Sequence, residues 1–185
     1  MGRTFTATQS GLTPMWRRAD DGELFQVEPD PNEYGLPPRG LRGRIRLNGI
    51  SEVFDMPNRF SDEPDAKVRK VRVEFEVLKA SGKNADLAGT RFTDLYTMSI
   101  HQKSNLGKLL GVLRGRAIDP GETVDIDAFI GTEFVAMTRL DDSGLFAGVS
   151  PDAIEPNSIT LWGGNGATPR PADDGAAVFE GDDDL

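Results

Sequence analysis

The sequence predicts a small, mainly β domain: a five-stranded Greek-key barrel with one helix between its third and fourth strands. Two observations lead to this fold class. Apolar and polar residues alternate in several separate stretches, which is the period of a half-buried strand. In one stretch the apolar period changes to that of a helix, and strand-like stretches follow it. With 185 residues, 37% of them hydrophobic, the chain can bury one core rather than two.

Three stretches ahead of the helix alternate, so each has one apolar and one polar side. They span residues 41–50, 68–80 and 90–101. The polar sides are rich in bases, which are Arg42, Arg44 and Arg46 in the first stretch, Lys70 and Arg72 in the second, and Arg91 in the third. We expect these bases to point outward and to lie side by side on neighbouring strands.

The helix is predicted over residues 104–114. Ser104 is a favourable N-cap, and Gly115 should end the helix. Leucines recur at i, i+3, i+4 and i+7 and form one apolar face, which suits a helix that plugs a barrel end; they are Leu106, Leu109, Leu110 and Leu113. Gly107 and Gly111 lie one turn apart, so either another segment approaches them closely or the helix is marginal alone.

Two further strands are predicted at residues 132–140 and 145–154. The order strand, strand, strand, helix, strand, strand is that of the oligonucleotide-binding (OB) barrel, although a short α+β sandwich gives a similar order. Residues 39–162 are thus expected to form one OB-like domain. Residues 1–38 hold five prolines and should be an irregular extension with a short strand at Leu24–Val27. Residues 163–185 are mostly glycine, proline and acid, and should be disordered.

Composition excludes several classes of chemistry. The chain has no cysteine, which rules out disulfides, thiolate metal sites and a cysteine nucleophile and fits a reducing cytoplasm, the expected location. It has neither a signal-peptide pattern nor an apolar run long enough for a membrane helix. His101 is the sole histidine and lacks a triad or zinc signature. The acids at 74–76 and 125–127 suggest a nuclease only weakly. We expect no enzymatic activity, metal or cofactor.

Charge is distributed unevenly along the chain. The net charge is -9, yet residues 1–38 carry -3, residues 39–118 carry +7, and residues 119–185 carry -13. This asymmetry predicts a domain that binds a polyanion and that carries a negatively charged tail. The alternative is that the solvated faces differ in sign by chance.

Single-stranded DNA binds to positive grooves and stacks its bases on aromatic rings. The strand bases named above are candidates for the groove, and Lys103, Lys108, Arg114 and Arg116 add charge around the helix. The aromatic candidates are Phe54, Phe60, Phe92 and Tyr96, of which we favour Phe60 and Tyr96. For Phe92 and Tyr96, core burial is an equal alternative. Arginines on an exposed strand can also simply prevent edge pairing.

Four segments, "SIHQKSNLGKLL", "LRGR", "AFIGTEFVAMT" and "AGVSP", lie within residues 94–151. They resemble a family of phage and prophage OB-fold proteins described as single-stranded DNA-binding or replication proteins. The resemblance implies binding of single-stranded DNA with little sequence preference, in phage DNA replication or recombination and in the host bacterial cytoplasm. Self-association is left open. The alternative is an OB-type protein-interaction module that does not bind nucleic acid.

The terminal stretch "DDGAAVFEGDDDL" resembles in composition the acidic tails of single-stranded DNA-binding proteins. Such a tail can recruit replication or recombination proteins or compete with DNA for a basic groove; the alternative is a solubility tail. Its candidate partner-binding residues are Phe179, Asp182, Asp183, Asp184 and Leu185. Leu185 stands where the bacterial proteins usually have phenylalanine, which puts in doubt their partners' recognition of this tail.

Overall fold

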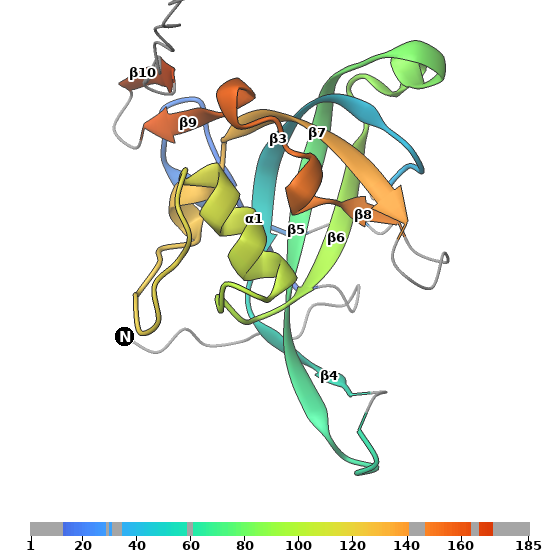
Figure 1. The fold of residues 1–185 in the computed structure, drawn as a ribbon, viewed down its shortest axis with the longest axis vertical. Helices are drawn as coiled ribbons and strands as arrows, with labels where there is room; N and C mark the ends of the chain where they lie inside the picture. The colour runs from blue at the N-terminus through green and yellow to red at the C-terminus, as the bar shows by residue number, and fades with distance from the viewer. Residues whose placement is uncertain are drawn as a thin grey trace, which may run out of the picture.

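The computed structural model describes residues 13–28, 30, 35–58, 61–140, 147–163 and 167–171. It confirms a mainly β fold, in which strands form a large antiparallel sheet and one α-helix packs against it (Figure 1). The elements are β1 (Met15–Arg18), β2 (Leu24–Val27), β3 (Arg42–Ser51), β4 (Phe54–Pro57), β5 (Lys67–Ala80), β6 (Arg91–Thr97), α1 (Asn105–Leu113), β7 (Glu133–Leu140), β8 (Ala147–Val149), β9 (Thr160–Gly163) and β10 (Ala167–Pro171).

Strand β3 is the centre of the sheet. It pairs with β5 on one side, and on the other with β7 along its first half and β1 along its second half. Strand β6 pairs with β5, and β8 pairs with β7. The predicted alternation is confirmed, because the inward residues of β3 and β5 form the core; they include Ile45, Leu47, Val71, Val73, Phe75 and Val77.

The alternation of β3 breaks at a bulge. Leu47 pairs with Phe75, but Gly49 pairs with Glu74, so Gly49 faces away from the core, although strict alternation would place it on the core face with Leu47. A Cβ atom at Gly49 would lie 2.8 Å from Cγ of Met15 and 2.9 Å from the carbonyl oxygen of Trp16. Glycine therefore allows β1 to pack closely beside β3.

The expected closed barrel is wrong, because the sheet is open. No backbone ladder joins β6 to β8 among the described residues. Strand β8 has only three residues, and its ladder partners lie on β7. Between β6 and β8 the backbone amide of Val149 instead donates to Oδ2 of Asp94, over 3.1 Å. A side chain thus stands where a closing ladder would run.

The short strand predicted at Leu24–Val27 is confirmed, but two segments are more ordered than the sequence predicts. Residues 15–18 and 24–27 form a hairpin that joins the main sheet, because β7 covers only the first half of β3 and leaves the second half open to β1. Within the predicted disordered region, β10 pairs with β9. Its prolines are compatible with a strand at the edge of a sheet.

Helix α1 confirms the predicted caps. The hydroxyl of Ser104 accepts a hydrogen bond from the amide of Gly107 at 3.0 Å. At the other end Gly115 has φ 77°, and the amides of Gly115 and Arg116 donate to the carbonyls of Val112 and Gly111. These two bonds form a Schellman motif. All four leucines of the apolar face are buried in the core.

Candidate nucleic-acid interface

The arginines of β3 point outward as predicted, but carboxylates surround them. Glu133 on β7 lies 3.3 Å from Arg44 and 2.8 Å from Arg46, and Glu76 on β5 lies 3.7 Å from Arg46. Arg42 pairs with Glu155 at 3.3 Å. The positive patch predicted along this strand is therefore largely compensated within the protein.

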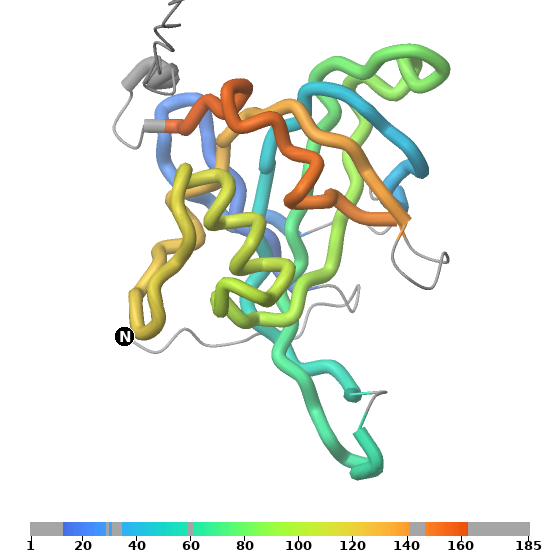
Figure 2. Tube along the Cα trace, viewed as in Figure 1, coloured from blue at the N-terminus to red at the C-terminus, as the bar shows by residue number. Residues whose placement is uncertain are grey.

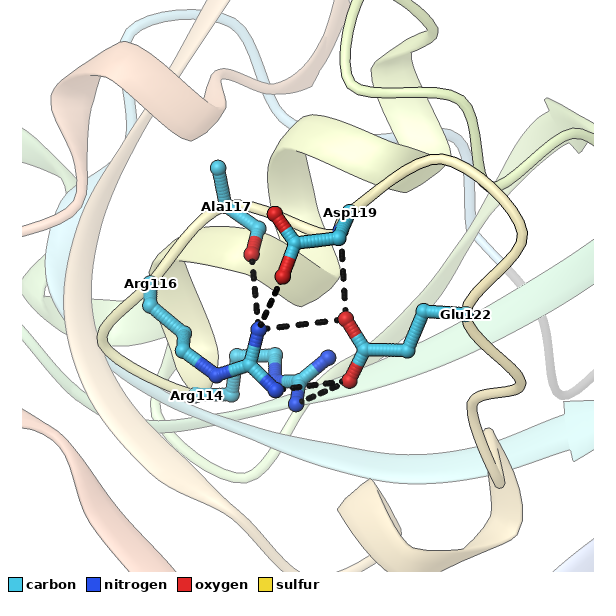
Figure 3. A network of polar contacts seen from close by, with 5 residues as sticks. All are labelled: Arg114, Arg116, Ala117, Asp119 and Glu122. Carbon is cyan, nitrogen blue, oxygen red and sulfur yellow. Dashed lines mark hydrogen bonds and ion pairs between the residues drawn. The ribbon is translucent and has the colours of Figure 1, made fainter.

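The two arginines at the end of α1 converge on one carboxylate (Figure 3). A turn over residues 119–122, with Gly121 at φ 83°, carries Glu122 back toward the helix. Both Arg114 and Arg116 contact its Oε1 at 2.7 Å. Their hydrogen bonds hold the pKa of Glu122 down, from 4.5 to about 2. These bases fasten the segment after α1 to the helix.

The lysines beside the helix are exposed. Within the described part of the chain, no ion pair involves Lys103 or Lys108. Nδ1 of His101 accepts a hydrogen bond from the amide of Lys103 at 3.2 Å, so the histidine side chain stabilises the turn before α1. Lys108 lines a groove of about 430 Å³ between α1, the connection at residues 115–118, and residues 152 and 156. Gly107 also lines the groove. A side chain at this position would collide with the backbone carbonyls of Ile100 and His101.

The outer face of β4, β5 and β6 combines cations with apolar groups. The guanidinium carbon of Arg72 lies 5.4 Å from the ring centroid of Phe54. Phe54 is opposite Lys70 in the β4–β5 ladder, and Leu95, 40% exposed, is opposite Arg72 in the β5–β6 ladder. Nζ of Lys70 donates to the hydroxyl of Thr97 at 2.8 Å. We call these five residues the platform.

Part of this surface extends beyond the body of the sheet. Strand β4 and the start of β5 form an arm that projects from the rest of the domain, clearest in the trace of Figure 2. Lys67 and Arg69 are exposed on the arm, and strand alternation turns them away from Lys70. Neither makes an ion pair within the described ranges, although Asp55 lies opposite Arg69 in register. The sequence reasoning overlooked Lys67 because it began the strand at residue 68, and it overlooked Arg69 because that residue has the parity of the inward Val71 and Val73.

Tyr96 is not a stacking surface. It is 4% exposed and lies in the core with Phe92, whose ring centroid is 5.4 Å from that of Phe75. The burial alternative therefore holds for Phe92 and Tyr96, and the prediction of a stacking role for Tyr96 is wrong. Burial and the neighbouring carboxylate of Asp94 raise the pKa of Tyr96 well above 10.0, so it stays neutral.

The remaining candidates are placed as follows. Arg91 lies opposite Glu76 in the β5–β6 ladder, and its carbonyl accepts a hydrogen bond from Gly35. Phe60 and the tail residues Phe179, Asp182, Asp183, Asp184 and Leu185 lie outside the described residues. Phe54, an aromatic candidate that the sequence did not favour, is the ring that the structure places among bases.

Comparisons with known proteins add no assignment, since no family model, curated protein or solved structure matches the chain. Across the described ranges, no group of three or more histidine and acidic side chains could hold a metal ion. No helix found there has the length and apolar character needed to cross a membrane.

Proposed function

We propose that this protein binds single-stranded DNA with little sequence preference through the platform. The observation that carries the proposal is the contact of Arg72 with the ring of Phe54, beside Lys70 and the exposed Leu95. Rings on a strand face accept any base, and stacking contributes about 1–3 kcal/mol per base, while neighbouring cations attract the phosphates. Such a surface does not need base-edge hydrogen bonds, which explains why we expect little sequence preference.

The arrangement of strands favours this location. The pairings β3–β5–β6, β3–β7 and β7–β8 follow the order of an OB-type Greek key, with α1 between its third and fourth strands. On that correspondence, β5 and β6 take the places of the second and third OB strands, whose outer face commonly binds oligonucleotides. The proposal treats the domain as an OB-type barrel left open between β6 and β8.

The roles of the other bases follow from their partners. Lys67 and Arg69 add positive charge on the face of the arm that is turned away from Lys70, whereas Glu76, Glu133 and Glu155 pair with the β3 arginines. A part in phage replication or recombination rests on the resemblance of residues 94–151. Partner recruitment or autoinhibition by the acidic tail rests on its composition.

Fluorescence anisotropy with labelled oligo-dT at two salt concentrations tests the proposal. We expect Phe54→Leu to weaken binding about 5- to 150-fold, the equivalent of one lost stack. Lys70→Ala should lower the salt slope by about 0.7, the value for one phosphate on a single strand. Lys79→Ala, a change of an exposed base at the far end of β5, is the matched control and should have little effect on either quantity.

Absence of oligonucleotide binding at low salt, also without residues 172–185, would rule the proposal out. The protein-interaction alternative would then gain ground. It is favoured by the compensated β3 arginines and by exposed apolar side chains such as Leu36, which is 88% exposed, and Phe25, which is 44% exposed. Its expected signature is a partner protein retained in a pull-down after nuclease treatment and lost in the Phe25→Ser variant.

A further inference from the structure

No backbone ladder joins β6 and β8 in the part of the chain that the structure describes. Strand β8 is tied to β7 by a three-residue ladder, and β6 is tied to β5 along its whole length. Between β6 and β8, Asp94 makes the one hydrogen bond seen among the described residues. We call the contact of Asp94 with residues 148–149 the seam.

The geometry of the seam is specific. Oδ2 of Asp94 accepts from the amide of Val149 at 3.1 Å, and Oδ1 accepts from the amide of Leu95 at 2.8 Å. A Cβ atom at Gly148 would lie 2.7 Å from Oδ2, so this approach requires glycine. One carboxylate therefore bridges the two strands and also holds the amide of a platform residue.

Across the residues that the structure describes, no cation is paired with this carboxylate. Its neighbour in the β5–β6 ladder is Val73, Tyr96 lies beside it on its own strand, and Gly148 approaches from β8. Arg139 of β7 pairs with Gly148 in the ladder but is exposed. Burial raises the pKa of Asp94 above 3.8, although the amide hydrogen bonds of Val149 and Leu95 and the hydroxyl of Tyr96 partly oppose that rise.

We propose that the seam opens as a local unit, separately from the rest of the sheet, with the Asp94 carboxylate as its latch. In the open state Asp94 meets water, and the cost of burying its charge disappears. The neutral form therefore favours the closed seam, and the charged form favours opening. The free energy that favours the closed seam is largest below the ordinary pKa of an aspartate. It falls as the pH rises through the pKa that Asp94 has in the closed state.

Amide hydrogen exchange by NMR tests the latch in the full chain. The amide of Val149 should be less protected than that of Leu47, which is bonded to Thr132 in the core. After correction for intrinsic exchange, protection of Val149 should fall with rising pH, by about tenfold for each unit by which burial raises the pKa of Asp94. A carboxyl titration of the same sample gives that pKa directly.

Two variants isolate the carboxylate. In Asp94→Asn the pH dependence at Val149 should vanish, whereas Asp86→Asn, a change of an exposed aspartate, should keep it. Equal protection of Val149 and Leu47, or no pH dependence in the wild type, would overturn the proposal, as would a pKa of Asp94 at or below 3.8. The wild-type measurements decide the matter even if the Asp94→Asn variant does not fold.

Discussion

Removing the charge partner of Glu74 should be among the most destabilising single changes in this protein. Glu74 is fully buried on the outer side of β5, where Nη2 of Arg17 lies 2.8 Å from its Oε2 and Asn48 donates to its Oε1. The Arg17 side chain is only 12% exposed. Arg17→Met leaves the carboxylate buried without a cation, which costs about 3–5 kcal/mol. That is a large part of the roughly 5–15 kcal/mol that stabilises a typical domain.

A second change should restore most of the loss. Glu74→Gln keeps an acceptor for Asn48 and removes the charge, so Arg17→Met with Glu74→Gln should lie within about 1.5 kcal/mol of the wild type, the usual worth of a neutral hydrogen bond. Urea unfolding followed by tryptophan fluorescence measures the wild type, the two single variants and the double variant, because Trp16 adjoins the site. If Arg17→Met shifts stability by less than about 0.5 kcal/mol, or if the double variant is no better than Arg17→Met, the reasoning fails.

Three further outcomes follow from the helix and its C-terminal connection, and unfolding curves measure each. Ser104→Ala should cost about 0.5–2 kcal/mol, because the amide of Gly107 loses its cap; an unchanged midpoint would contradict this. Gly107→Ala should destabilise although alanine favours helices, since its Cβ would collide with the carbonyl of His101. Gly111→Ala, with its nearest contact at 3.3 Å, should do so less. The stabilisation from Glu122 is present above pH 4.5 and is lost as the pH falls toward about 2. Glu122→Gln should therefore make the melting temperature less dependent on pH over that range. An unchanged pH dependence of the melting temperature would count against the network.

The hydrophobic periodicity of the sequence predicted the elements that are long enough to show a repeat. Strands β3 and β5 contain enough residues for their alternation to define an inner and an outer face, and α1 is framed by Ser104 and Gly115. Strands β1 and β4 have four residues each, too few for a period to stand out. The requirement for glycine at position 49 could not be predicted locally, because the contacts that impose it come from β1, another part of the chain.

Closure was the least predictable property of the sheet. The order of elements suits a closed barrel, but closure depends on whether β8 comes within ladder distance of β6. The seam holds an aspartate and a glycine, and neither has a strong strand propensity. The alternation placed Asp94 on the same side as Phe92 and Tyr96, yet nothing in the local sequence says that its carboxylate ends on the backbone of β8.

The candidate site shows why strand parity predicts the direction of a side chain but not its available charge. Strand β3 has neighbours on both sides, and its outward arginines find Glu76 on one and Glu133 on the other. Those glutamates lie far away in sequence, so no local pattern reveals the pairing. On the arm, β4 has only β5 as a partner, and Lys67 and Arg69 remain exposed. Positive charge is therefore most available to a ligand where the sheet runs out of neighbouring strands, which places the arm ahead of β3 as a surface that a polyanion would meet.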